Sequence, residues 1–402
     1  MSEVTEAGPA RDVSLGELSH EVRRWCAEHV PPDWRREQAG VGHDEFVRFQ
    51  RWWFDELKSG GYAFPHWPAS WGGGYDLAQQ AVVFEELARA DAPRLVLHFV
   101  ALHHAAATLL AAGTERQRAD YLPAIRDGEV WCQGFSEPNA GSDLASLGTR
   151  AERRGDVYVV NGQKIWASGA LDSTWCLLLA RTDASAPKRR GITYLIMDMR
   201  TPGVTVRPIR QITGEQHFCE IFLTDVEIPV DNRIGAENEG WRIAQSTLNS
   251  ERGATMIELA ERLAYGFRWL VDLAARNGEL GGADTLWDDR LARLASEVQA
   301  LRLLARRPLA GTHDGAAYGA FASTVKLFYS ELLQRMTRLG VELSGLPGQE
   351  WQVRPLSSGW ESGLWLLDHI GSWEWTIPGG TSEIQRTIIG ERGLGLPREA
   401  LS

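Results

Sequence analysis

The hydrophobic and polar positions follow three successive periods along the chain. From Ser14 to about Gly128, apolar residues recur every three or four positions, as on one face of an α-helix. From about Trp131 to Pro229 the period falls towards two, which is typical of β-strands. From Glu239 onward the helical period returns in long stretches. Helices, then strands, then helices predict an α+β chain rather than a doubly wound nucleotide-binding fold.

Local signals give the ends of several expected elements. Ser14 with Glu17, and Thr114 with Gln117, each form a capping box that begins a helix. The β-rich runs are Val157–Val160, Trp175–Leu179, Ile192–Met197, Val204–Val206 and Glu220–Leu223. The later helical runs are about Gly240–Arg276, Leu286–Arg306, Ala316–Leu339, Gly359–Ile370 and Gly380–Gly393. We therefore expect an N-terminal helical domain (1–129), a small antiparallel β-barrel or sandwich (130–238) and a C-terminal helical bundle (239–402).

Composition and charge exclude several classes of protein. The 402 residues are 44% hydrophobic and carry a net charge of −11 without a basic block, so nucleic acid is not expected as the main partner. Cys26, Cys132, Cys176 and Cys219 are far apart and form no metal-binding pattern. They are predicted to be buried, in a reducing compartment.

The stretch Leu95–Ala112 comes nearest to a membrane span. It is interrupted by His98, His103 and His104, so we expect a buried core helix and no membrane-spanning segment. The polar N-terminus, Met1 to Asp12, lacks the apolar segment of a signal peptide. These features predict a cytoplasmic protein.

Three runs carry groups that suit a cofactor or a substrate. The run Trp131–Asp143 ends a strand with small hydroxyl and backbone N–H groups, which bind heterocycles and pyrophosphates, although taken alone it also fits an ordinary turn. Trp166 and Ser168 are expected on the same side of a strand, beside a planar cofactor, although a core tryptophan is the commoner interpretation. Gly379 and Gly380 directly precede a helix, a position that favours an anion or a carbonyl oxygen.

Glu251 occupies an unusual position in the helical pattern. It falls within an apolar stripe formed by Trp241, Ala244, Leu248, Thr255, Leu259, Leu263, Phe267 and Leu270. A carboxylate that faces a core is costly unless it is paired or has a raised pKa, and a raised pKa suits a general base near neutral pH. Glu251 is therefore a candidate catalytic base. The structural alternative is a buried ion pair with Arg252 or another cation.

Five segments together resemble the acyl-CoA dehydrogenase family, and the resemblance covers nearly the whole chain. In order they are Phe135–Asp143, Lys164–Ser168, Asp225–Pro229, Gly235–Trp241, and Gly380–Arg386 followed by Ile388 and Ile389. The resemblance implies an N-terminal helical domain, a central β domain and a C-terminal four-helix bundle. It also implies that FAD accepts a hydride from an acyl-CoA thioester that is desaturated between its α and β carbons.

The resemblance further implies roles for individual residues. Those that contact the flavin ring are Gln133, Phe135, Ser136, Trp166 and Ser168. Those that hold the FAD diphosphate or ribityl chain are Thr381 and Glu383, and those that reach the FAD of a neighbouring subunit are Arg276, Glu342 and Gly345. The substrate contacts are Ser142, toward the pantetheine arm, and Arg252. The stretch Leu95–His104 is expected to line the acyl pocket.

The position of the catalytic base separates two groups within that family. Many members carry a glutamate immediately before the Gly-Thr of the C-terminal signature, where this chain has Gly379. A smaller group, which includes isovaleryl-CoA dehydrogenases, carries its base in a Glu-Arg pair on the long helix, and Glu251–Arg252 is similar to that pair. We therefore expect Glu251 to remove the α proton while the backbone N–H of Gly379 binds the thioester carbonyl.

Two departures from the family pattern concern the cofactor and the assembly. An Arg-x-x-Phe-Gly motif is replaced by the run Arg276–Leu280, and Glu342 replaces the glutamine of a Gln-x-x-Gly-Gly motif. Similar changes occur in actinobacterial members that pair two different subunits, so a homodimer, a homotetramer and a heterotetramer all stay open. The alternatives to a complete dehydrogenase are a non-catalytic or cofactor-sharing subunit and an acyl-CoA oxidase. The expected partners are an acyl-CoA or acyl carrier protein thioester and electron-transferring flavoprotein.

Overall fold

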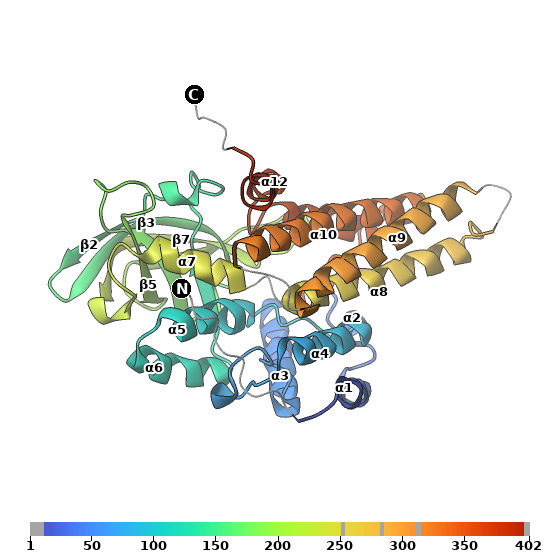
Figure 1. Cartoon of the computed structure of the whole chain (residues 1–402), viewed down its shortest axis with the longest axis horizontal. Coiled ribbons are helices and arrows are strands. Elements are labelled where there is room, and N and C mark those ends of the chain that lie inside the picture. The colour runs from blue at the N-terminus through green and yellow to red at the C-terminus, as the bar shows by residue number, and fades with distance from the viewer. Residues whose placement is uncertain (1–11, 251–253, 282–284, 311–314, 398–402) are drawn as a thin grey trace. The chain divides into compact units, whose positions relative to one another are not determined.

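The computed structural model describes residues 12–250, 254–281, 285–310 and 315–397. The chain divides into two compact units. The first unit comprises Met1–Arg48, Glu56–Arg94 and Arg252–Ser402, and the second unit comprises Phe49–Asp55 and Leu95–Glu251. In Figure 1 the strands, all of which belong to the second unit, run from teal-green to yellow-green.

The second unit is built around one sheet of eight strands in the order β6-β7-β3-β2-β4-β5-β8, with β1 paired to β4 outside that path. The strands are β1 (Trp131–Gly134), β2 (Arg150–Arg154), β3 (Val157–Ser168), β4 (Trp175–Arg181), β5 (Ile192–Asp198), β6 (Val204–Pro208), β7 (Phe218–Pro229) and β8 (Arg233–Ile234). Most pairs are antiparallel, as expected, but β1 and β2 each pair with β4 in parallel. All five predicted β-rich runs lie within strands.

The core of this sheet is made mainly of cysteine, alanine and aliphatic side chains. The buried cluster includes Cys132, Cys176 and Cys219 together with residues such as Val160 and Leu195. The fourth cysteine, Cys26, is buried in the first unit, and none of the four forms a disulfide. Burial disfavours a thiolate, and it raises the pKa of Cys219 to about 11. The predicted role of the cysteines as buried small hydrophobic residues is therefore confirmed.

Three helices and a π-helical turn pack against this sheet or against one another. They are η2 (Val100–Ala105, the π turn), α5 (Ala106–Ala112), α6 (Glu115–Arg126) and α7 (Gly240–Ser250). The Thr114–Gln117 capping box begins α6 as predicted. The expected core helix over Leu95–Ala112 is shorter than predicted, because its helical backbone starts only at Phe99 and its first turn is π-helical. Across the described residues, every helix is too short or too polar to cross a membrane.

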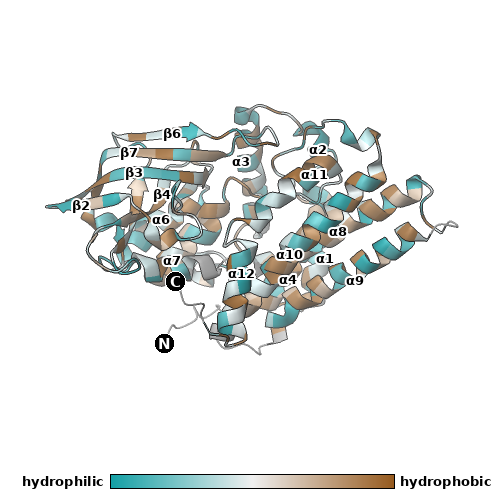
Figure 2. Cartoon of the chain, turned by 90° about the horizontal axis from the view of Figure 1, so that it is seen from above, coloured by the Kyte–Doolittle hydropathy of each residue, from teal (hydrophilic) through white to brown (hydrophobic). Residues whose placement is uncertain are grey.

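The regular secondary structure of the first unit is helical in its described parts. Its N-terminal helices are α1 (Leu15–His29), α2 (Trp34–Glu37), α3 (His43–Gly60, of which residues 49–55 group with the second unit) and α4 (Leu77–Arg89). Its C-terminal helices are α8 (Ala254–Arg276), α9 (Leu286–Arg306), α10 (Gly315–Ser344), α11 (Trp365–Ser372) and α12 (Ser382–Ile388). Along α8, α9 and α10 the ribbons of Figure 2 carry apolar and polar residues side by side, as in amphipathic helices.

Backbone conformation explains where these helices depart from the predicted ranges. The predicted helix over Gly359–Ile370 begins only at Trp365, because Gly363 has a φ of 83° and interrupts a right-handed helix. The predicted helix over Ala316–Leu339 continues to Ser344 and ends at Gly345, whose φ of 57° is typical of a helix C-terminus.

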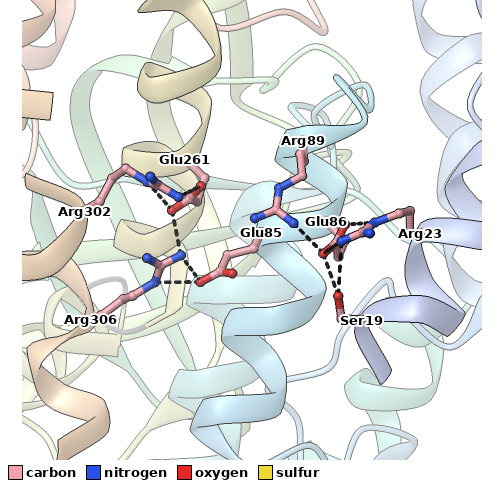
Figure 3. Close-up of polar contacts among 8 residues, drawn as sticks. All are labelled: Ser19, Arg23, Glu85, Glu86, Arg89, Glu261, Arg302 and Arg306. Atoms are coloured by element: carbon pink, nitrogen blue, oxygen red, sulfur yellow. Dashed lines mark hydrogen bonds and ion pairs between the residues drawn. The ribbon is translucent and has the colours of Figure 1, made fainter. Parts of the chain in front are cut away.

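Adjacent carboxylates on α4 connect the N-terminal helices of the first unit to its C-terminal helices (Figure 3). Glu86 accepts hydrogen bonds from Ser19 and Arg23 of α1 at 2.8 and 2.9 Å. Glu85 pairs with Arg306 of α9 at 2.7 Å. Arg306 also contacts Glu261 of α8 at 2.8 Å, and Arg302 holds the same carboxylate with two hydrogen bonds. This network orients four helices around the apolar bundle core.

Asp368 provides a pH-dependent contribution to the stability of the first unit. Its fully buried carboxylate accepts hydrogen bonds from the Ser362 backbone N–H at 2.9 Å and from the Ser362 hydroxyl at 2.7 Å. Burial disfavours the charged form more strongly than these bonds favour it, so the pKa of Asp368 is raised to about 7.

We predict that Asp368→Asn removes this pH dependence. Because the folded-state pKa lies above the unfolded value, protonation of Asp368 stabilises the fold at low pH, and this contribution is lost as the pH rises through about 7. Relative to the variant, the wild-type unfolding free energy should fall by roughly 2–3 kcal/mol between about pH 5 and about pH 8. Urea unfolding of both proteins at several pH values measures this difference. A difference that stays constant with pH would contradict the assignment.

Candidate functional site

A buried lysine connects the ends of β1 and β3 in the second unit. The Lys164 side chain is 0% exposed. Its Nζ donates to the carbonyl oxygen of Phe135 at 3.1 Å and to Glu137 at 2.8 Å. Glu137 in turn accepts hydrogen bonds from the backbone N–H groups of Gly148 and Thr149 at 2.6 and 2.9 Å. One ion pair therefore fixes the strand end and the loop that follows it.

The pKa shifts of this pair follow from burial and mutual attraction. Burial lowers the pKa of Lys164, and the opposite charge of Glu137 partly offsets that effect. Burial by itself raises the pKa of Glu137, but the Lys164 charge and the hydrogen bonds from residues 148 and 149 bring it below its usual value. Sequence reasoning assigned no role to Lys164. The alternation of the strand could have identified it, because Lys164 lies an even number of residues after Tyr158 and Val160 and therefore shares their buried face of β3.

Trp166 adopts a strained backbone conformation two residues after Lys164. Its φ is 64°, and the β3–β7 register shifts between Lys164 and Ala167. A left-handed conformation is rare for a bulky residue, and such strain concentrates at functional sites. The indole is 55% exposed and meets the edge of Phe218 at 6.1 Å between ring centroids. The alternative of a core tryptophan is therefore wrong. The bulge also interrupts the strand alternation on which the expected same-side placement with Ser168 depended.

The other predicted flavin-ring residues lie on β1, β3 and the adjoining segment of the same unit. Among the residues that the structure describes, no hydrogen-bond partner is found for the buried amide nitrogen Nε2 of Gln133. Phe135 is buried against the edge of Tyr194. The carbonyl of Ser136 accepts the Ile165 N–H at 3.0 Å, which holds the two strand segments side by side. A donor without a partner on β1 and an exposed aromatic ring on β3, in the same unit, are features that suit a planar ligand with acceptor atoms on its edge.

Ser142 is exposed on the loop that follows β1 in the second unit. The next residue, Asp143, pairs with Lys188 at 2.7 Å. The guanidinium of Arg181 donates to the carbonyls of Ala145 and Leu147 at 2.7 and 3.0 Å. These contacts hold the loop in place. Among the described residues, none of these hydrogen bonds involves the Ser142 hydroxyl.

The predicted Gly379–Gly380 turn belongs to the first unit. Both glycines have positive φ angles, 65° and 98°, which strain any other residue. Gln385 Nε2 donates to the Gly379 carbonyl at 2.7 Å, and Lys326 donates to the Gly380 carbonyl at 2.8 Å. Thr381 caps α12, as predicted, because its hydroxyl accepts the Ile384 N–H. The turn is therefore held from both sides, and Glu383 lies in the first turn of the helix that follows.

Arg276, Glu342 and Gly345 lie near the adjacent ends of α8 and α10 in the first unit. Asn277 Nδ2 donates to the Leu343 carbonyl at 2.7 Å, which joins these two helix ends. Glu342 forms ion pairs with Arg290 and Arg338. Burial raises the pKa of Glu342, but the hydrogen bonds and charges of both arginines together lower it by more, so the pKa of Glu342 lies below its usual value. The acid that replaces the family amide is thus a carboxylate with two cationic partners.

Glu251 and Arg252 lie outside the described residues. The apolar stripe is buried in the described helices on either side, for example at Ala244 of α7 and at Leu259 and Leu263 of α8. The described parts of the predicted helix over Gly240–Arg276 are helical, as α7 before residues 251–253 and as α8 after them. The assignment of Glu251 as the catalytic base stays a prediction.

We predict that Glu137→Gln destabilises the second unit strongly. The substitution leaves the Lys164 ammonium buried without its counter-charge, which typically costs about 3–5 kcal/mol. Combining it with Lys164→Met removes the uncompensated charge and should recover most of that loss. Urea unfolding monitored by tryptophan fluorescence compares the two variants. Equal destabilisation of the single and the double variant would show that the ion pair does not hold this site together.

Three family models match successive segments of the chain. The acyl-CoA dehydrogenase N-terminal domain matches residues 15–129, the middle domain matches residues 132–226 and the C-terminal domain matches residues 238–394. The acyl-CoA dehydrogenase IpdE1 of Mycobacterium tuberculosis is 38% identical over 392 residues, which cover 96% of this chain and 98% of the relative. The mitochondrial isovaleryl-CoA dehydrogenase of Pongo abelii is 26% identical and covers 93% of this chain, with 87% of its own length matched.

Solved structures agree with these sequence matches. The Tcur3481–Tcur3483 steroid ACAD has a TM-score of 0.82 and 32% identity over 96% of this chain and 98% of that chain. A chain of the ChsE4–ChsE5 complex from Mycobacterium tuberculosis has a TM-score of 0.79 and 30% identity, with 96% and 98% of the two chains covered. The domain matches together span most of the sequence, in the order helices, β domain, helices. The chain therefore belongs to the acyl-CoA dehydrogenase family of oxidoreductases.

Proposed function

We propose that this chain binds FAD and desaturates an acyl-CoA thioester, with Glu251 as the base that removes the α proton. The observation that carries the proposal is the exposed, strained Trp166 on β3, two residues after the buried Lys164 that joins β3 to the end of β1. The Gln133 amide on β1 adds a buried donor for which no partner is found among the described residues. An exposed aromatic surface and a free hydrogen-bond donor are the groups that the isoalloxazine ring needs, because the ring is planar and has acceptor atoms along its edge. When bound, FAD supplies the acceptor for the hydride that leaves the β carbon.

The residues of the second unit divide into cofactor and substrate contacts in this proposal. Trp166 covers the ring, and Gln133 donates to its edge. Phe135, Ser136 and Ser168 supply further contacts, partly through backbone atoms. Ser142, exposed on its loop, contacts the pantetheine arm of the thioester. The exposure of Trp166 and Ser142 and the unpartnered amide nitrogen of Gln133 are compatible with these proposed contacts.

The residues of the first unit serve the diphosphate and the thioester carbonyl. Thr381 and Glu383 hold the FAD diphosphate or ribityl chain. The backbone N–H of Gly379 donates to the carbonyl oxygen, where negative charge grows as the α proton leaves. A fixed donor of this kind typically contributes about 3–4 kcal/mol to transition-state stabilisation. The turn is suited to that task because both of its carbonyls are already engaged by Gln385 and Lys326.

Glu251 is the favoured base because the alternative family position cannot accept a proton. That position is Gly379, which has no side chain. The Glu251–Arg252 pair is similar to the pair on the long helix of isovaleryl-CoA dehydrogenases. Arg252 is then proposed as a contact of the substrate. The position of Glu251 in an apolar stripe of the sequence suits this role, because removal of a carboxyl group from water favours its neutral form and general-base catalysis near neutral pH needs a raised pKa.

We predict that Glu251→Gln leaves FAD bound but slows anaerobic bleaching of the flavin by substrate about 100-fold or more. The amide keeps the size of the side chain and removes its basicity. Stopped-flow absorbance measures the bleaching rate, and the flavin content of the purified protein measures binding. Glu239→Gln, which makes the same change in an exposed ion pair with Arg242, serves as the control and should bleach normally. Normal bleaching by the Glu251 variant would remove Glu251 from the mechanism.

A second candidate function is that of a cofactor-sharing subunit in a heteromeric dehydrogenase. Glu342 supports it, because a carboxylate already paired with Arg290 and Arg338 is a poor substitute for an amide that contacts the FAD of a neighbouring subunit. Two similar solved structures carry paired names, the Tcur3481–Tcur3483 steroid ACAD and the ChsE4–ChsE5 complex. In either case we infer that electron-transferring flavoprotein accepts the electrons.

The flavin content of the chain expressed alone distinguishes these two functions. We expect the isolated chain to bind FAD and to bleach on addition of a suitable acyl-CoA. The absorbance of flavin released by denaturation, divided by the protein concentration, gives the number of cofactors per chain. A colourless chain that acquires flavin only when it is co-expressed with a second dehydrogenase chain would favour the shared-cofactor function.

A further inference from the structure

Two buried threonines connect α5 and α7 in the second unit. The hydroxyl oxygens of Thr108 and Thr247 lie 2.6 Å apart, and each residue is 2% exposed. Thr108 belongs to α5 and Thr247 to α7, which pack against each other. Side-chain hydroxyls of this kind are costly to bury unless they are hydrogen-bonded. Here both are satisfied by each other and by backbone carbonyls.

The hydrogen-bond distances indicate the direction of this link. Thr108 Oγ1 lies 2.7 Å from the carbonyl oxygen of His104, so its single proton is donated there. Thr247 can then donate to Thr108 Oγ1 at 2.6 Å, which is shorter than its contact with the Ile243 carbonyl at 3.2 Å. The link therefore runs from α7 through Thr108 to the backbone of the π turn η2.

The π turn itself contacts the strand that carries the flavin-ring residues. η2 packs against β1, which contains Gln133, and also against α7. A π turn adds one residue to a helical turn and is frequently found at functional sites. The π turn is therefore in contact with both β1 and α7. The hydroxyl pair of Thr108 and Thr247 joins α7 to the backbone of this π turn.

We propose that Thr247 and Thr108 are positioning residues for the α-proton transfer. Thr247 precedes Glu251 by four positions in the sequence, the spacing of about one helical turn. A directional hydrogen bond at Thr247 sets the rotation of α7 about its axis, which an apolar contact of the same shape does not. Replacing both partners of a buried hydrogen bond by isosteric apolar groups is nearly neutral for stability, so packing alone does not require the two hydroxyls. This inference rests on the proposed function of Glu251.

The test compares Thr247→Val, Thr108→Val and the double variant with the wild-type enzyme. Valine keeps the shape of threonine and removes the hydroxyl. We expect each single variant to retain wild-type flavin affinity but to bleach about 10- to 100-fold more slowly, as small misplacements of reacting groups do. The pH dependence of the bleaching rate should also shift, because the base would lie in an altered environment. The double variant should be no slower than either single variant, and Thr247→Ser should restore most of the rate.

Thr337→Val is the matched control. Thr337 is fully buried in α10 of the first unit, and its hydroxyl bonds to the Leu333 carbonyl of its own helix. This control should leave the bleaching rate and its pH profile unchanged. If Thr247→Val fails to fold, Thr108→Val tests the same hydrogen bond from α5, and Thr247→Ser tests the hydroxyl itself.

Two results would overturn the inference. One is a wild-type rate and pH profile in both folded valine variants, and the other is an equal loss of rate in Thr337→Val. Failure of the proposed function is distinguishable, because it appears as normal bleaching by Glu251→Gln. An inactive Glu251→Gln together with a fully active Thr247→Val would remove the positioning role and leave the proposed function intact.

Discussion

The Lys164–Glu137 ion pair is the constraint on which the candidate site residues described in the second unit depend. A fully buried ammonium requires a counter-charge and further acceptors, and the residues that meet this requirement are Glu137 and the Phe135 carbonyl. The pair therefore fixes the end of β1, the end of β3 and the loop between Glu137 and Thr149. The pair also anchors β3 two residues before Trp166, whose left-handed backbone is a strained conformation.

The sequence predicted the elements whose signals are local. The capping boxes at Ser14 and Thr114 begin helices as expected, and the predicted helix over Leu286–Arg306 has the observed bounds. Departures arose where backbone conformation overrides the hydrophobic period. Gly363 delays the start of α11, and the π turn before α5 cannot be read from apolar spacing. The parallel pairing of β1 with β4 depends on contacts between segments far apart in sequence.

The sequence motifs name candidate site residues, but they do not give the exposure or the ion pairs of those residues. The motif residues from Gln133 to Ser168 do belong to one unit, on neighbouring segments. The exposure of Trp166 was not predictable, because a β-bulge reverses the usual expectation for a large aromatic residue. The paired state of Glu342 depends on Arg290, which is distant in sequence. Helical spacing singles out Glu251 from the chain alone, and its role depends on chemistry that only an experiment can establish.

The most direct test of the central claim is the kinetic isotope effect on anaerobic flavin bleaching. The substrate is whichever acyl-CoA in a panel bleaches the flavin, deuterated at the α carbon, at the β carbon, or at both. The account predicts a primary isotope effect at each position, because a base removes the α proton and the β hydrogen leaves as hydride. Bleaching that is insensitive to deuterium at both carbons, or a flavin that no acyl-CoA bleaches, would contradict it.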